Sequence, residues 1–248
     1  MVNLETLTRA IEYELEKSHQ HLKLPQQPKY TFNYFHNRFC NERIQEKELG
    51  IAVRADGKIC NFVKGDYESI TLDYDEIKNS YDRYGELHFT HNHPRESGRI
   101  VAECLSDGDV ANLFRQIVTW DKETGEIMHV YPFKSMSCES ANGSRMTLVR
   151  GDKFKMENYT NVMELQKELW NYWDSYQENY YNAKMNGQLP KSTSDFSSWD
   201  EYNAYAHNEA IKKLGRFEQT PEFRDLKKRF RKLDCRLTYD YPFPYRIQ

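Results

Sequence analysis

Two histidines at alternate positions, followed by a short acidic segment, are the residues of this chain whose types and spacing could bind a metal ion. His91 and His93 lie in the stretch HFTHNHP, and Asp109 ends the stretch SDGD. Side chains at i and i+2 of a strand point to the same face, so a strand here would present both imidazoles side by side, with His88 facing away. Zinc in catalytic sites takes three protein ligands and keeps one position for water, and Asp109 at the start of a following helix could reach back as the third.

A hydrolytic site also needs a base that takes the proton from the metal-bound water. Glu48 is the candidate, because it directly precedes a predicted strand that would bring its carboxylate to the metal if it lies beside the histidine strand. Each residue also has a purely structural interpretation. The histidines can be surface residues, Ser106 and Asp109 have the spacing of a helix capping box, and Glu48 can be a solvated carboxylate in a charged run. The residues alone leave these alternatives open.

The elements that must hold these residues can be predicted from hydrophobic periodicity and turn signals. Strands are predicted at 49–55, 59–63, 87–93, 127–133 and 145–149, and helices at 3–22, 73–83, 108–120, from 160 onward, at 198–215 and from 221 onward. The first two strands flank the turn sequence ADGK and should form a hairpin. The alternation of strands and helices indicates an α/β fold of the layered α+β type.

The chain divides into three predicted segments. Residues 1–39 form an N-terminal helix and an aromatic linker, residues 40–156 form the layered domain with the candidate site, and residues 157–248 form a C-terminal helical extension. The many tryptophans and tyrosines of the last segment favour packing of its helices onto the domain over a partner-binding surface. Pro242 and Pro244 exclude a regular helix at the end of the chain, where we expect an extended arm.

Bulk composition narrows the class of protein. The chain has 248 residues, a formal net charge of −3 and 29% charged residues, and its mean hydropathy is −0.92, so nothing demands nucleic acid. We find no signal peptide and no apolar run of the roughly 18 residues that a membrane span needs. Five scattered cysteines without a Cys-x-x-Cys pair suit reduced thiols in the cytoplasm. The basic run 227–232 could contact nucleic acid, although a solvated helix face is the more common interpretation.

The order of a glutamate, a strand, His-x-His-Pro and Ser-x-x-Asp resembles the signature of the JAB/MPN (JAMM) metalloprotease family, with the match falling in residues 40–156. The sequence THNHP is most similar to that of the RadC-like and the phage- or toxin-associated bacterial branches of this family. The resemblance implies a cytidine-deaminase-like mixed sheet flanked by helices, with Zn²⁺ bound by His91, His93 and Asp109. It implies Glu48 as the general base and Ser106 as a donor that stabilises the oxyanion. The implied activity is that of a zinc metallopeptidase or isopeptidase acting on a protein or peptide, such as a ubiquitin-like or other protein modifier.

The chain departs from the family pattern between the histidines and the serine. Twelve residues separate His93 from Ser106, so the loop 94–105 is enlarged and could shape a substrate groove or cover the site. Cys104 could place a thiolate in the open zinc position, or it could be a small buried apolar residue. RadC-like relatives keep the motif without an obvious proteolytic role. A DNA-associated or mobile-element accessory protein, or a catalytically silent scaffold, is therefore the alternative to an enzyme.

Overall fold

The computed structural model describes residues 48–57, 59–65, 69–93, 104–139, 144–185, 189 and 192–240. Several predictions concern segments outside these ranges. They are the helix at 3–22, the aromatic linker that follows it, most of the enlarged loop at 94–105, and the prolines near the end of the chain.

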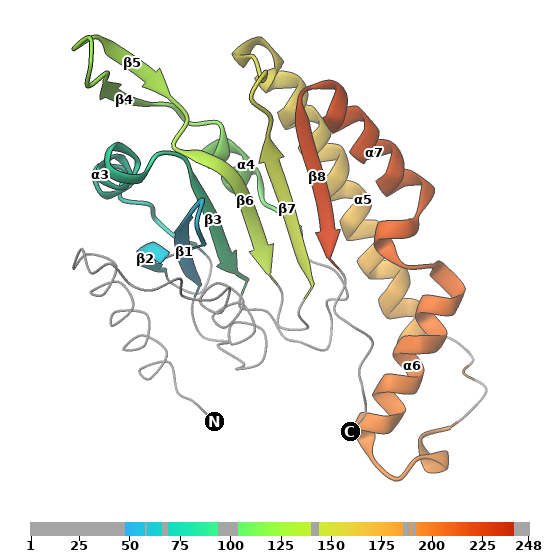
Figure 1. Cartoon of the computed structure of the whole chain (residues 1–248). Helices are drawn as coiled ribbons and strands as arrows, with labels where there is room; N and C mark the ends of the chain where they lie inside the picture. The colour runs from blue at the N-terminus through green and yellow to red at the C-terminus, as the bar shows by residue number, and fades with distance from the viewer. Residues whose placement is uncertain are drawn as a thin grey trace.

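Six strands form one mixed sheet in the order β2-β1-β3-β6-β7-β8 (Figure 1). Their bounds are Leu49–Arg54 for β1, Ile59–Lys64 for β2, Leu87–Asn92 for β3, Phe133–Glu139 for β6, Arg145–Arg150 for β7 and Cys235–Asp240 for β8. Only β3 and β6 run parallel, and every other neighbouring pair is antiparallel. Helices flank this sheet, so the fold is mixed α and β, as the alternation of elements predicted.

A parallel pair needs a crossover connection, and the one between β3 and β6 contains the elements nearest the candidate site. It holds helix α4 (Asp107–Leu113) and a separate two-stranded sheet of β4 (Ile117–Trp120) and β5 (Ile127–Val130). Helix α3 (Tyr74–Tyr84), which connects β2 to β3, packs against β2 and β4. The β4–β5 hairpin extends beyond the sheet at the end opposite the tip of the β3 arrow (Figure 1).

The predicted helix at 108–120 is wrong in its second half. Helix α4 ends at Leu113, and the residues from Ile117 to Trp120 form strand β4. Consecutive β-branched residues in the sequence IVT favour a strand, and β4 buries alternate side chains as a half-exposed strand does. The predicted strand at 127–133 is correct only as far as Val130, where β5 ends. Tyr131 and Pro132 follow it, and strand β6, which begins at Phe133, was not predicted.

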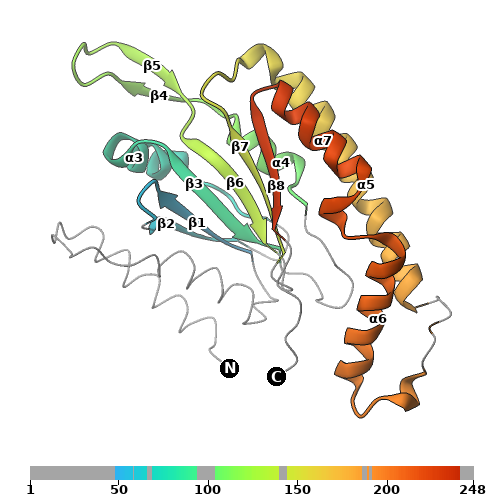
Figure 2. The ribbon, with the colours of Figure 1, turned by 45° about the vertical axis from the view of Figure 1, so that its right-hand side comes forward.

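Three helices lie together along one side of the molecule, beyond β8 (Figures 1 and 2). They are α5 (Tyr159–Met185), α6 (Trp199–Leu214) and α7 (Pro221–Lys232). The predicted apolar stripe of α5 is buried: Val162, Leu165, Leu169, Trp173 and Tyr176. After α7 the chain returns to the sheet as β8, which pairs with β7. The sequence analysis identified the helices of this segment but not the strand that completes the sheet.

Aromatic residues of the C-terminal segment join its elements to one another. The ring of Phe217 lies 5.1 Å from that of Tyr176, 4.8 Å from that of Phe223 and 5.3 Å from that of Tyr239. These contacts connect α5, α7 and β8, as expected if the aromatics serve packing. Trp199 is an exception, since it is exposed at the start of α6.

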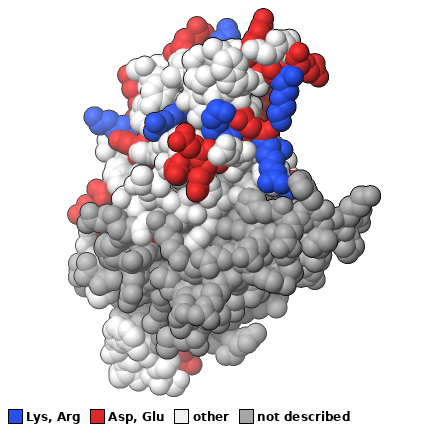
Figure 3. Space-filling model, turned by 90° about the vertical axis from the view of Figure 1, so that its left-hand side faces the viewer, with Lys and Arg blue, Asp and Glu red and all other residues white. Residues whose placement is uncertain are grey.

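The basic run of α7 is divided between intramolecular contacts and solvent. Arg229 forms a bidentate ion pair with Glu168 at 2.5 and 2.7 Å, and Lys227 lies over the ring of Phe223. Lys228 and Arg231 are exposed. On the described part of a different face, Lys and Arg lie among Asp and Glu and form no single patch (Figure 3).

Two further properties concern the whole described part of the chain. None of its helices is both long enough and apolar enough to cross a membrane. The four cysteines within it, Cys60, Cys104, Cys138 and Cys235, are buried and form no disulfide.

A partly buried histidine of α6, at its contact with α5, should make stability depend on pH. Burial, and then the charge of Lys184, lower the pKa of His207 from 6.5 to about 4. The Nδ1 atom of His207 lies 2.7 Å from the Tyr180 hydroxyl, at hydrogen-bond distance. The pKa is lower in the folded state, so stability is full above about pH 6.5 and is lost as the pH falls toward 4. Allowing for partial exposure, we expect a loss of about 1 kcal/mol between pH 7 and pH 5. Urea unfolding at both pH values should show a smaller loss in His207→Gln, and an equal loss in both proteins would contradict the assignment.

Candidate metal site

The carboxyl end of β3 presents two histidines to one point. His91 and His93 are 3% and 8% exposed, and their Nε2 atoms lie 2.9 Å apart. His93 follows the last residue of β3, but its backbone N–H still donates to the carbonyl of Glu139 at 3.0 Å, so the pairing with β6 continues through it. The alternation of a strand therefore brings both imidazoles to the same side, as the i, i+2 spacing predicted.

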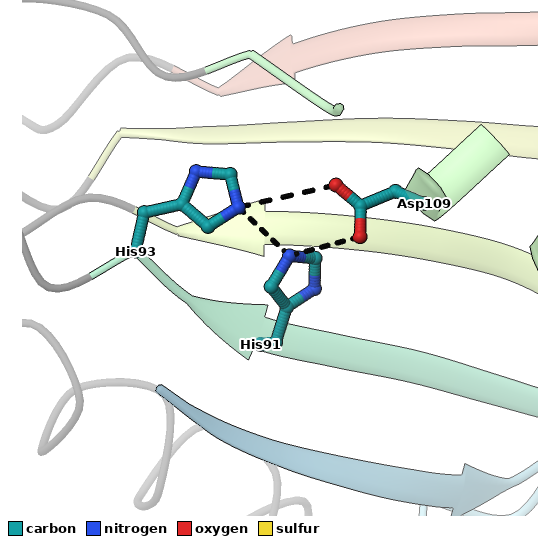
Figure 4. A group of neighbouring side chains, drawn as sticks. All are labelled: His91, His93 and Asp109. Carbon is teal, nitrogen blue, oxygen red and sulfur yellow. Dashed lines mark hydrogen bonds and ion pairs between the residues drawn. The ribbon is translucent and has the colours of Figure 1, made fainter. Parts of the chain in front are cut away.

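A carboxylate from α4 faces these rings (Figure 4). Asp109 Oδ1 lies 3.1 Å from His91 Nε2, and Asp109 Oδ2 lies 3.9 Å from His93 Nε2. The same Oδ2 accepts hydrogen bonds from the backbone N–H and the hydroxyl of Ser106, at 2.7 and 2.8 Å. Ser106 and Asp109 thus form the capping box that their spacing allowed, and the carboxylate still reaches the histidines. The sequence left open whether Asp109 caps the helix or faces the histidines. In the structure its side chain does both.

The three side chains lie close enough together to hold a metal ion. Four ligand atoms at 2.0–2.1 Å in a tetrahedron lie about 3.3 Å from one another. His91 Nε2 lies 2.9 Å from His93 Nε2 and 3.1 Å from Asp109 Oδ1, whereas the 3.9 Å distance from His93 Nε2 is to the other carboxylate oxygen, Oδ2. With one ligand atom taken from each residue, all three lie within 4.8 Å of one another. Among the described residues this is the one group of three or more His, Cys, Asp or Glu side chains whose potential ligand atoms all lie close together. Two imidazoles and a carboxylate also form a usual donor set for catalytic zinc, with the fourth position left to water.

The environment favours the charged form of Asp109. Its burial alone would raise the pKa of the carboxyl group, but interactions with His91, His93 and the Ser106 N–H outweigh this effect and hold the pKa well below its usual value. The carboxylate is therefore deprotonated at neutral pH, which is the state that binds a metal.

Glu48 lies at the start of the neighbouring strand and is 8% exposed. The antiparallel pairing of β1 and β3 extends as far as Gly50 opposite His91. Glu48 lies two residues before Gly50, and His93 lies two residues after His91. Directly opposite residues of an antiparallel pair share a face. The structure therefore brings Glu48 to the end of the sheet where the histidines lie, although its carboxylate is not one of the three clustered ligand groups.

Three residues that the sequence analysis did not single out hold β1 in this place. The side-chain oxygen of Asn92 accepts a hydrogen bond from the Leu49 N–H at 2.6 Å, and the Glu48 carbonyl of the same peptide group accepts one from Gly65 at 2.8 Å. At Gly50 a Cβ atom would lie 2.3 Å from the ring of Phe89, so only glycine fits between the strands. The position of Asn92 between the two histidines in the sequence was the signal that could have identified it.

The remaining predicted residues are placed as follows. The Ser106 hydroxyl donates a hydrogen bond to Asp109 Oδ2 and so supports that carboxylate. Cys104 is fully buried and is not part of the ligand group. His88 is also outside the group, and its Nδ1 lies 2.7 Å from the Ser135 hydroxyl.

We expect Ser106→Ala to weaken zinc binding roughly 10- to 100-fold, because it removes a hydrogen bond that orients a ligand. It should also cost about 1 kcal/mol of stability through the lost helix cap. Ser198→Ala is the matched control, since Ser198 caps α6 in the same way and lies on another element. Competition with a chromophoric chelator should separate the two: similar stability losses, but weaker zinc binding in Ser106→Ala alone. Equal zinc affinities would show that Ser106 does not support the site.

Comparisons with protein-family models, with curated proteins and with solved structures find no match to this chain. The assignment of a function therefore depends on the geometry of the site itself.

Proposed function

We propose that the protein is a zinc-dependent hydrolase of the JAMM type that cleaves an amide, peptide or isopeptide bond. One observation carries this proposal: His91, His93 and Asp109 converge at the end of β3, with one potential ligand atom of each within 4.8 Å of the others. The place of Glu48, two residues before the Gly50 that pairs with His91, supports it, because a metallohydrolase needs a base beside its metal.

In this proposal the side chains divide the work of an amide hydrolysis. Zinc, when bound, would polarise the substrate carbonyl and lower the pKa of a bound water toward neutrality. Glu48 accepts the proton of the attacking water and passes it to the leaving amine. Ser106 keeps Asp109 oriented, and its hydroxyl would have to rotate away from that carboxylate to act as an oxyanion donor. We therefore place it as a positioning residue.

The substrate class follows from the resemblance in the histidine motif. We infer a protein or peptide substrate, with a ubiquitin-like or other protein modifier as a candidate, and a cytidine-deaminase-like JAB/MPN arrangement of the mixed sheet. The carboxyl end of β3 is then the end of the sheet that the substrate must approach, since both proposed ligands of that strand lie there.

The direct test is metal removal and return. The full chain is stripped with a chelator, dialysed and assayed against fluorogenic peptides and lysine isopeptides, with and without one equivalent of zinc. We expect hydrolysis only in the zinc-restored protein. Equal hydrolysis by the stripped and restored samples would refute a zinc-dependent mechanism, and no hydrolysis by a zinc-loaded sample across broad libraries would favour a binding role.

A further inference from the structure

A buried glutamine of the C-terminal helices contacts the segment that carries the metal ligand. Gln166 is 0% exposed and lies within the apolar stripe of α5. Its side-chain amide donates a hydrogen bond to the backbone carbonyl of Leu105. Its Oε1 atom is also buried and has no hydrogen-bond partner among the described residues. Packing alone would be better served by leucine or methionine, because a buried polar atom without a partner costs stability.

The contact reaches the site through a short series of neighbours. Leu105 is fully buried and directly precedes Ser106. Ser106 holds Oδ2 of Asp109 through two hydrogen bonds, and Oδ1 of the same carboxylate faces His91. A shift of the Leu105 carbonyl would therefore move the cap that orients the third ligand.

Helix α4 has little means of holding itself in place. It has seven residues, and helices this short are not stable without tertiary packing. Its far end is fixed by Phe114, whose ring lies 4.4 Å from that of Phe154 and 6.1 Å from that of Tyr159, the first residue of α5. Its near end is fixed by Gln166. Contacts with α5 thus lie at both ends of the helix that presents Asp109.

We propose that Gln166 is a positioning residue for the metal site, through which α5 holds the Leu105–Asp109 segment in the geometry that binds the ion. This inference rests on the proposed zinc site and extends it. The C-terminal helices become part of the support of the site, and Gln166 is the side chain that makes the polar connection.

The test compares two buried residues of the same helix in the full chain. Gln166→Met keeps the volume of the side chain. It removes the unpartnered Oε1 but also takes the Gln166 donor from the buried Leu105 carbonyl. These two effects on stability oppose each other, so the melting temperature should stay within about 3 °C of the parent. We expect its zinc affinity, from chelator competition, to fall roughly 10- to 100-fold and the visible spectrum of its Co²⁺ form to change. Leu169→Ala, one turn further along α5, should melt at a clearly lower temperature with zinc affinity within about threefold of the parent. Gln166→Leu repeats the loss of the donor if the methionine variant does not fold.

The outcomes separate this inference from the proposed function. A parent protein that binds zinc, with Gln166→Met and Gln166→Leu binding it equally well, would overturn the positioning role alone. Affinity that falls in Leu169→Ala as much as in Gln166→Met would also overturn it, because helix stability would then be the cause. A parent protein that binds no zinc would overturn both proposals.

Discussion

Replacing His93 with alanine is expected to lower the zinc affinity of the full chain roughly 10²- to 10³-fold. Structural zinc sites bind with about 10–16 kcal/mol in total, so one of four ligands accounts for about 2.5–4 kcal/mol of this. Within the described ranges, His93 is one of the three residues that supply the clustered ligand atoms. Isothermal titration or chelator competition measures the effect directly.

The matched control lies on the same strand. His88 has the opposite parity to His91, and its ring contacts Ser135. His88→Ala should therefore keep the parent zinc affinity, even if it lowers stability through the lost hydrogen bond. Equal losses of zinc affinity in the two variants would mean that the metal site does not depend on this face of β3.

The second large effect is expected on catalysis and not on metal binding. Glu48→Gln keeps the size of the side chain but removes its ability to accept a proton, so kcat should fall roughly 10²- to 10⁴-fold. The zinc affinity should stay close to that of the parent, because Glu48 is not among the clustered ligands. The assay uses the peptide or isopeptide that the zinc-loaded parent hydrolyses best, with zinc content measured on each sample.

Glu46→Gln provides the control for the assignment of the base. Glu46 lies in the same charged run, two residues before Glu48. It should retain the parent kcat if the β1–β3 register places the base correctly. A large loss in Glu46→Gln with none in Glu48→Gln would show that the wrong glutamate has been chosen.

The part of the site that could be predicted from sequence is the part set by local geometry. Two histidines at i and i+2 share a face in any strand, and a Ser-x-x-Asp sequence caps a helix wherever one begins. The place of Glu48 was harder to predict, because it depends on how β1 aligns with β3. These strands are distant in sequence: Leu49 and Asn92, which are hydrogen-bonded, are 43 residues apart.

The features that sequence analysis missed depend on contacts between distant segments. Strand β8 has the alternating pattern of a half-buried strand, but its place at the edge of β7 follows from the return of the chain after α7. In the sequence, Gln166 cannot be distinguished from other polar residues of a helix. Its hydrogen bond to Leu105 depends on how α5 packs in the folded protein. The error at 108–120 has the opposite origin, since apolar spacing suited a helix there while β-branched residues and tertiary packing produced a strand.

The most direct test of the central claim is anomalous diffraction from crystals of the full chain grown with zinc, with data collected on both sides of the zinc absorption edge. We predict one peak bonded to the Nε2 atoms of His91 and His93 and to a carboxylate oxygen of Asp109, each at about 2.0–2.2 Å. The carboxylate of Glu48 should face the side of the ion that these ligands leave open. A zinc peak held by other residues, or none at this end of β3 in a protein shown to be zinc-saturated, would contradict the account.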